Sequence, residues 1–529
     1  MTADINALVN GLRPLSSLSR PREMIRQFTP NWFAATMGTG ILALALPQIP
    51  GVGPMLQPVG EALWFLNIGL FILFAGLYTA RWVMFGQEAR RIFGHNTVSM
   101  FIGTIPMGLA TIINGFLAFG LPRFGAGVIP ITETLWWIDV AMSLACGVAI
   151  PYLMFTRHEH SLDGMTAVWL LPVVAAEVAG ASGGLLAPHL ADAHTQLVVL
   201  ATSYVLWAYS VPVAFGILAI LILRMALHKL PHESMAASSW LALGPIGTGS
   251  LGMLVLGGDA PAILAASGLA QIGQVAQGIG TIAGLLLWGF GLWWLALATM
   301  ITLRYWRAGV PFNLGWWGYT FPLGVYAVAT FKLGTTLHLG FFGIFGTILT
   351  VALAAMWLLV GAKTLAGGWK GHLFVSPCIA ATNWSAKRID RPRPFLATPA
   401  PTTLRPRKHR NLTQRPLLSA QIRACLRPVA HLPRTAGLGG WIPDNPSALC
   451  CSCLMPWPLA SGRSSATASA LSAACSVGGT GASSSPGAAV RGIRRLCGLY
   501  STATKRHDGR NRGADSLRIC QQSVHHWTI

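Results

Sequence analysis

Basic residues recur in every second gap between the apolar stretches of this chain. Ten stretches, each roughly as long as a membrane-spanning helix, cover 28–46, 62–80, 98–119, 134–155, 165–187, 197–223, 236–256, 274–303, 314–331 and 339–362. Of the 16 Lys and Arg in residues 1–376, 14 fall on one side of a ten-pass arrangement, and only Arg123 and Lys332 fall on the other. Because loop Lys and Arg are retained in the cytoplasm, the pattern predicts an all-α polytopic membrane protein with both ends of its ten-helix region inside the cell.

The composition separates two parts of the chain. Residues 1–376 hold 16 Lys and Arg against 12 Asp and Glu, whereas residues 377–529 hold 21 against 4, with eight of the nine Cys. We predict a cytoplasmic segment over 1–27, a ten-helix membrane transport domain over 28–376 and a basic tail over 377–529. Residues 1–27 lack the apolar core of a cleavable signal peptide, so the first helix is expected to act as the insertion signal.

The tail has no apolar period long enough to form a core. Its Arg, Pro, Ser, Ala, Gly and Cys are typical of an out-of-frame translation of GC-rich DNA, which is the favoured interpretation; a disordered basic extension is the alternative. A metal site at Cys450, Cys451 and Cys453 is disfavoured, because no second Cys or His pair follows at a suitable spacing. A basic arm for acidic lipids or nucleic acid is a further alternative, although no nucleic-acid partner is expected.

Each odd-numbered stretch has a proline in or at the start of its apolar run. The five are Pro30, Pro106, Pro172, Pro245 and Pro322. They lie 76, 66, 73 and 77 residues apart, so one repeat corresponds to one helical hairpin. Proline kinks a helix and frees carbonyl groups, which in lipid must meet protein or water. The repeat predicts five hairpins around a central pore, with the kinked odd helices inside.

Small residues accompany these prolines and are predicted to let an ion approach the backbone. They include Gly38, Thr39, Gly40, Gly247 and Gly249. The alternative is that prolines and small residues serve only helix packing, as they do in many membrane helices. The regular spacing of the prolines favours the pore.

Few ionisable residues lie within the stretches, namely Asp139, Glu177 and, near a helix end, Lys332. A lining of hydroxyl, backbone and apolar groups does not attract cations, which require carboxylate rings, so an anion pathway is favoured. Glu177 either couples protons to anion movement or is bonded within the bundle. Asp139 is assigned a structural role. Lys332 is either an anion-attracting vestibule charge or a residue that snorkels to the surface.

Four sequence runs, in order along residues 24–380, carry a family resemblance. They are Phe28-Thr-Pro-Asn-Trp-Phe-Ala-Ala-Thr-Met-Gly-Thr-Gly-Ile41, Leu243-Gly-Pro-Ile-Gly-Thr-Gly249, Trp316-Trp-Gly-Tyr-Thr-Phe-Pro322 and His372-Leu-Phe-Val-Ser-Pro-Cys378. They resemble the tellurite-resistance/dicarboxylate transporter family. That family includes bacterial tellurite-resistance proteins, the yeast malate permease, fungal sulfite efflux pumps and plant slow anion channels.

The resemblance implies five hairpins around a pore, with odd helices inside, assembled as a homotrimer. It also implies a gate, because in channel members a phenylalanine of the ninth helix plugs the pore immediately before the helix-breaking proline. The matching residue is Phe321, which lies between Thr320 and Pro322. The resemblance further implies that the native chain ends soon after Cys378.

These observations predict transport of a small anion in the plasma membrane, the inner membrane of a bacterium. The expected substrate is a C4-dicarboxylate such as malate or succinate, or a sulfite- or tellurite-type oxyanion; a pH-insensitive chloride or nitrate channel is the alternative. An enzyme is disfavoured, because the stretches contain no His-Glu-x-x-His and no Gly-x-Ser-x-Gly with a His partner, and no nucleotide-binding loop occurs. No cofactor or metal is expected.

Overall fold

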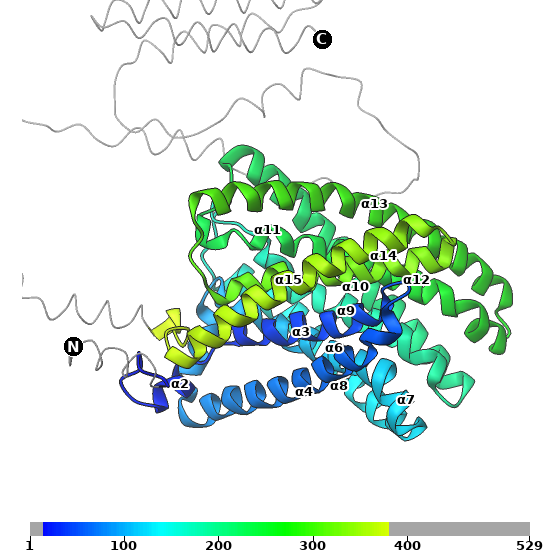
Figure 1. Cartoon of the computed structure of the whole chain (residues 1–529), viewed down its shortest axis with the longest axis horizontal. Helices are drawn as coiled ribbons and strands as arrows, with labels where there is room; N and C mark the ends of the chain where they lie inside the picture. Colours follow the sequence, from blue (N-terminus) through cyan, green and yellow to red (C-terminus); the bar gives the residue numbers. More distant parts are fainter. Residues whose placement is uncertain (1–13, 380–529) are drawn as a thin grey trace, which may run out of the picture. The chain divides into compact units, whose positions relative to one another are not determined.

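The computed structural model describes residues 14–379, which form helices joined by short loops (Figure 1). No strand occurs within these residues. Eight helical segments among them are long and apolar enough to cross a membrane: Gly53–Met84, Val98–Phe124, Ala126–Thr156, Ala167–His189, Ala193–His228, Glu233–Ala266, Ala270–Ala308 and Gly340–Lys370. The stretches predicted at 28–46 and 314–331 form shorter helices. Except for residues 377–379, the basic tail lies outside the described residues.

The helical segments differ in how deeply they are buried. The spans Val98–Phe124, Ala167–His189 and Glu233–Ala266 have 72%, 94% and 89% of their apolar windows buried. The other five spans have between 17% and 33% buried. The shorter helices α3 (Ala34–Ala45) and α14 (Phe321–Leu337) are buried along most of their length. These differences separate enclosed helices from helices with exposed apolar surfaces.

The enclosed helices contact one another in a closed cycle, which we call the five-helix ring. Its members are α3, α6 (Thr104–Gly115), α9 (Leu171–Leu186), α12 (Leu243–Ala266) and α14. Each contacts the next in this order, and α14 returns to α3. The ring therefore joins the first and the last of the enclosed helices.

The exposed helices lie outside this ring. They are α4 (Gly53–Met84), α8 (Ile129–Thr156), α10 (Ala193–His228), α13 (Ala270–Ala308) and α15 (Gly340–Lys370). Each contacts two neighbouring ring helices; α4, for example, packs on α3 and α6. Figure 1 shows α4 and α13 on opposite sides of α3, α6 and α9. Their large apolar side chains, such as Ile72, Leu286 and Leu358, are exposed, as expected of surfaces that face lipid.

The chain after α15 returns to its beginning. The ring of Phe374 stacks on Trp32, with 4.8 Å between ring centroids. The backbone N–H of Ser376 donates to the side-chain oxygen of Gln27 over 2.9 Å. The buried Arg81 guanidinium donates to the Phe28 carbonyl oxygen and to the Ser376 hydroxyl. Residues 372–377 are thereby held against the end of the ring where the ring helices begin.

Candidate functional site

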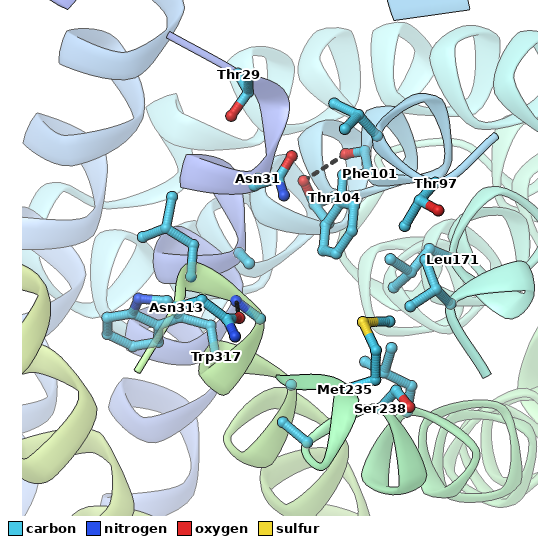
Figure 2. Close-up of a pocket in the computed structure, with 18 of the residues that line it drawn as sticks. Thr29, Asn31, Thr97, Phe101, Thr104, Leu171, Met235, Ser238, Asn313 and Trp317 are labelled. Carbon is cyan, nitrogen blue, oxygen red and sulfur yellow. Dashed lines mark hydrogen bonds between the residues drawn. The ribbon is translucent and has the colours of Figure 1, made fainter. Parts of the chain in front are cut away.

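A cavity of about 490 Å³ lies where the N-terminal ends of the five ring helices meet. Figure 2 shows side chains from all five segments around it: Thr29 and Asn31; Thr97, Phe101 and Thr104; Leu171; Met235 and Ser238; Asn313 and Trp317. His372, Leu373, Val375 and Pro377, which follow α15, complete the lining. The cavity therefore belongs to the ring as a whole and not to one pair of helices.

The five predicted prolines stand at this end of the ring. Four lie in the first turn of α6, α9, α12 and α14, and Pro30 begins the 3-10 turn η1 (Pro30–Phe33) that leads into α3. Short turns likewise precede the other four: η4 (Val98–Gly103), η7 (Ala167–Leu170), α11 (Ser238–Leu241) and η10 (Leu314–Tyr319). Amide groups in a first helical turn have no intrahelical partner, so proline sacrifices no hydrogen bond there. The prolines thus mark where a tight turn becomes an α-helix; none interrupts the middle of a ring helix.

The electrostatics of the cavity suit an anion. The positive end of a helix dipole is its N-terminus, and five such ends meet here. The lining includes no Asp or Glu, and its ionisable side chains are His95 and His372. Polar groups are present on several segments; Thr104 Oγ1 donates to the Phe101 carbonyl oxygen over 2.7 Å, the dashed line in Figure 2. A negative ligand would meet favourable dipoles and no opposing carboxylate.

Phe321, the predicted gate, is the first residue of α14 and lines the cavity beside Pro322. Its side chain is only 3% exposed. Thr320 precedes it and donates its hydroxyl to the Trp317 carbonyl oxygen over 2.7 Å. A Cβ on Gly38 of α3 would lie less than 3.0 Å from the Thr320 hydroxyl and from the Trp317 ring. Gly38 therefore permits the close contact between α3 and the segment that carries Phe321.

The other predicted small residues lie at helix contacts and not in the cavity lining. Gly40 abuts Thr111 of α6, and a Cβ on Gly247 would lie 3.1 Å from the Tyr326 backbone nitrogen of α14. Thr39 accepts a hydrogen bond from Trp357 of α15, and Gly249 faces side chains of α10 and α13. In the structure, these residues pack helices together within the ring and against the helices around it.

Glu177 is completely buried on α9 and does not line the cavity. Its Oε2 atom lies 3.2 Å from the Ser210 hydroxyl of α10, and its Oε1 atom has no hydrogen-bond partner. The same hydroxyl is 2.9 Å from the Val173 carbonyl oxygen. Since a hydroxyl has one proton to donate, both contacts are satisfied together when Glu177 is protonated and donates to Ser210. The geometry favours a neutral carboxyl at the α9–α10 contact.

Asp139 and Lys332 also lie away from the cavity. Asp139 is completely buried on α8, and neither of its carboxyl oxygens has a hydrogen-bond partner. A lone buried carboxylate is unfavourable, which again favours the neutral acid. Lys332 is partly buried on α14, and its Nζ atom lies 3.9 Å from the position that a Cβ on Gly258 of α12 would occupy.

Comparison with known proteins identifies the family. The chain matches the voltage-dependent anion channel family, SLAC1, over residues 27–365. It belongs to this family. The resemblance inferred from the four sequence runs is confirmed, and the protein is an anion transport protein of the membrane.

Several known proteins resemble the chain over most of their length. The sulfite efflux pump of Arthroderma benhamiae is 38% identical over 354 residues, which are 66% of this chain and 93% of the pump. An uncharacterised transporter of Methanocaldococcus jannaschii is 29% identical over 353 residues, or 66% of this chain and 96% of the transporter. The malic acid transport protein of Schizosaccharomyces pombe is 23% identical over 348 residues, covering 64% and 78% of the two chains.

The polar residues of the cavity of this family member were not predicted from its sequence. Asn31 and Thr104 lie within two residues of Pro30 and Pro106, whereas Ser238 and Asn313 lie seven and nine residues before Pro245 and Pro322. The proline repeat therefore indicates the neighbourhood of Asn31 and Thr104, but it gives no close signal for Ser238 and Asn313. His95 carries no comparable signal, because it lies in a loop whose position depends on tertiary contacts.

The imidazole ring of His95 forms hydrogen bonds with the backbone at the start of η4. Its Nδ1 atom accepts hydrogen bonds from the backbone N–H groups of Thr97 and Val98, each over 3.2 Å. Protonation of Nδ1 would abolish both bonds. Burial of the imidazole, and then the nearby His158, lower the pKa of His95 below its usual value. The neutral ring is thus the form that stabilises the cavity wall.

Acidification is expected to destabilise the protein through His95, and His95→Asn is expected to remove that sensitivity. A lowered pKa in the folded state provides stability above the ordinary histidine pKa, and the stability is lost as pH falls through the folded value. Asparagine has no titrating group, and its side-chain oxygen can accept hydrogen bonds from backbone N–H groups a few residues ahead. Between pH 7.5 and pH 5, the free energy of unfolding obtained from thermal unfolding should fall less in the variant than in the wild type. The difference should be about 1 kcal/mol, the usual contribution of one capping side chain.

The control for this comparison is His194→Asn, which replaces an exposed histidine. It should follow the wild-type pH profile. Parallel profiles for all three proteins would contradict the role assigned to His95.

Proposed function

We propose that the protein moves a small anion through the middle of its five-helix ring. The observation that carries the proposal is the convergence of the five helix N-terminal ends on a cavity with no acidic side chain in its lining. In this proposal ten helices form five hairpins, with the odd helices inside. Phe321 constricts the path at the N-terminal end of α14, beside Thr320 and Pro322.

The substrate class follows from the cavity and the relatives. We propose a small oxyanion of the sulfite type or a C4-dicarboxylate. A cavity of about 490 Å³ lies within the size range of small-molecule sites and admits either. Relatives named as a sulfite efflux pump and a malic acid transport protein support both. Chloride or nitrate conduction without proton coupling is a second candidate, favoured by the separation of Glu177 from the cavity.

We propose that the protein lies in the plasma membrane and that its cavity faces the cytoplasm. It lies at the end where the loops after α4, α8, α10 and α13 connect to the next ring helix. Those loops hold Arg90, Arg157, Lys229 and neighbouring basic residues, which are retained inside. Both ends of the membrane domain are then cytoplasmic, and the exposed helices face lipid.

We also propose assembly as a homotrimer, in line with the family resemblance. The five exposed helices offer apolar surface both to lipid and to neighbouring copies. Native mass spectrometry of the protein in detergent should give a mass three times that of the chain. A monomer at all concentrations would contradict this assembly.

Transport can be tested with the full chain in liposomes. Uptake of sulfite, malate, succinate and chloride would be recorded with and without an imposed pH gradient. Saturable uptake of sulfite or a dicarboxylate above that of protein-free vesicles is expected. Uptake that follows the gradient indicates coupling to protons, whereas chloride flux independent of it supports the channel alternative. The absence of flux for all four anions would overturn the proposal.

A further inference from the structure

A second group of ionisable side chains lies toward the opposite end of the ring from the cavity. Asp259 stands 16 residues beyond the start of α12 and Lys332 stands 11 residues beyond Phe321. At a rise of 1.5 Å per residue, they lie about 24 Å and about 16 Å along their helices. Asp259 was not expected within a span, because the predicted stretch ended at 256. The structure extends α12 to Ala266 and places Asp259 in the helix.

The Lys332 ammonium is the cation of this group. Its Nζ atom reaches α12 at Gly258, the residue immediately before Asp259. Arg123, the other basic residue predicted on the outer side, is paired with Glu61 over 2.8 Å. Lys332 forms no salt bridge among the described residues. Its positive charge is therefore available to another negative group.

Asp259 interacts electrostatically with Lys332 but does not pair with it directly. The groups within electrostatic range of Asp259 come from three elements: Lys332 from α14, His189 from the turn that follows α9, and Tyr204 from α10. The Tyr204 hydroxyl is buried and has no hydrogen-bond partner. The adjoining helix α13 has no ionisable residue before Arg304. The carboxyl is thus the acid that opposes the Lys332 charge at this end of the ring.

We propose that Lys332 binds the transported anion at the outer end of the pathway and that Asp259 controls this binding. Ionised Asp259 competes with the anion for the ammonium. Protonated Asp259 leaves the ammonium to the anion, and the Tyr204 hydroxyl supplies a further donor. A proton and a small oxyanion therefore bind together at this end. The inference rests on the proposed anion transport and adds the residues by which external pH would govern it.

The test is sulfite uptake into liposomes by the full-length protein, with the outer pH varied from 5 to 8. In the wild type, the KM for sulfite should fall as the outer pH falls. In Asp259→Asn, the KM at pH 7.5 should be lower by about threefold to tenfold, the effect of removing one nearby charge, and its pH dependence should flatten. Asp259→Glu retains the charge and should retain the pH dependence.

Three further variants separate this inference from general effects. Lys332→Gln should raise the KM, and the double variant Asp259→Asn/Lys332→Gln should lose the gain in affinity seen with Asp259→Asn alone. Glu133→Gln removes an acid on α8, which packs on α6 and α9, and should behave as the wild type. If the wild type takes up sulfite but Asp259→Asn keeps the wild-type KM and pH profile, or if the lowered KM persists in the double variant, this inference alone is overturned. No uptake by the wild type overturns the proposed function.

Discussion

Replacement of Phe321 by alanine is expected to raise anion flux by about tenfold or more, equivalent to lowering the barrier by about 1.4 kcal/mol. The side chain is 3% exposed and lines the cavity at the first residue of α14. An apolar constriction obstructs an ion by excluding the water that accompanies it. Removal of the ring widens this point and admits water. The measurement is sulfite and chloride flux in liposomes, supported by bilayer conductance.

The matched control is Phe331→Ala on the same helix. Phe331 is also buried, but it packs against Gly346 of α15 and does not line the cavity. Its replacement removes the same volume and is expected to lower stability by about 3 kcal/mol without raising flux. Equal flux in Phe321→Ala and wild type, with both eluting as folded protein, would remove Phe321 from the role of gate.

Replacement of Gly103 by alanine, which adds a Cβ atom, is expected to destabilise the ring by about 1–3 kcal/mol, the usual penalty of overpacking. Gly103 ends η4, and its Cβ would lie no more than 3.0 Å from the Leu171 carbonyl group and the Pro172 Cα atom. These are backbone atoms at the start of α9, so they cannot rotate away as a side chain could. Gly103→Ala should therefore lower the unfolding temperature measured in detergent and reduce anion flux, because both segments line the cavity.

Gly289→Ala provides the comparison for this substitution. Gly289 lies on an exposed face of α13 with no heavy atom near the position of a Cβ. Alanine there should leave stability unchanged or raise it slightly, because it favours the helix over the unfolded chain. If Gly103→Ala unfolded at the wild-type temperature, the close packing of η4 and α9 would not be a source of stability.

The helices of the membrane domain could be predicted because their signals are local. Runs of apolar residues indicate the long helices, and the five prolines mark where the enclosed helices begin. The position of Asp259 inside a helix is not predicted by these local signals. The residue follows Gly257 and Gly258, which resemble the start of a loop, yet packing against α13 and α14 continues the helix past them. Tertiary contacts overrode the weak propensity of the two glycines.

The candidate site was predictable only in part for the same reason. Phe321 was indicated by its family motif and does line the cavity, whereas the contact between Glu177 and Ser210 joins residues 33 positions apart. Arg81 counted only as one more basic residue near a helix end. The structure buries it and uses it to hold the C-terminal stretch through Ser376. Such pairings depend on which helix faces are brought together, and a single sequence contains no direct signal for that.

Closure of the ring through α14 and α3 constrains how the protein is made. These helices are the last and the first of the ring to leave the ribosome, and nearly the whole membrane domain is synthesised between them. Until α14 and the turn before it are made, α3 lacks one of its neighbours in the ring, and the face around Gly38 lacks its contacts with Trp317 and Thr320. A chain that stops before α14 therefore has an open arc of enclosed helices in place of the closed ring.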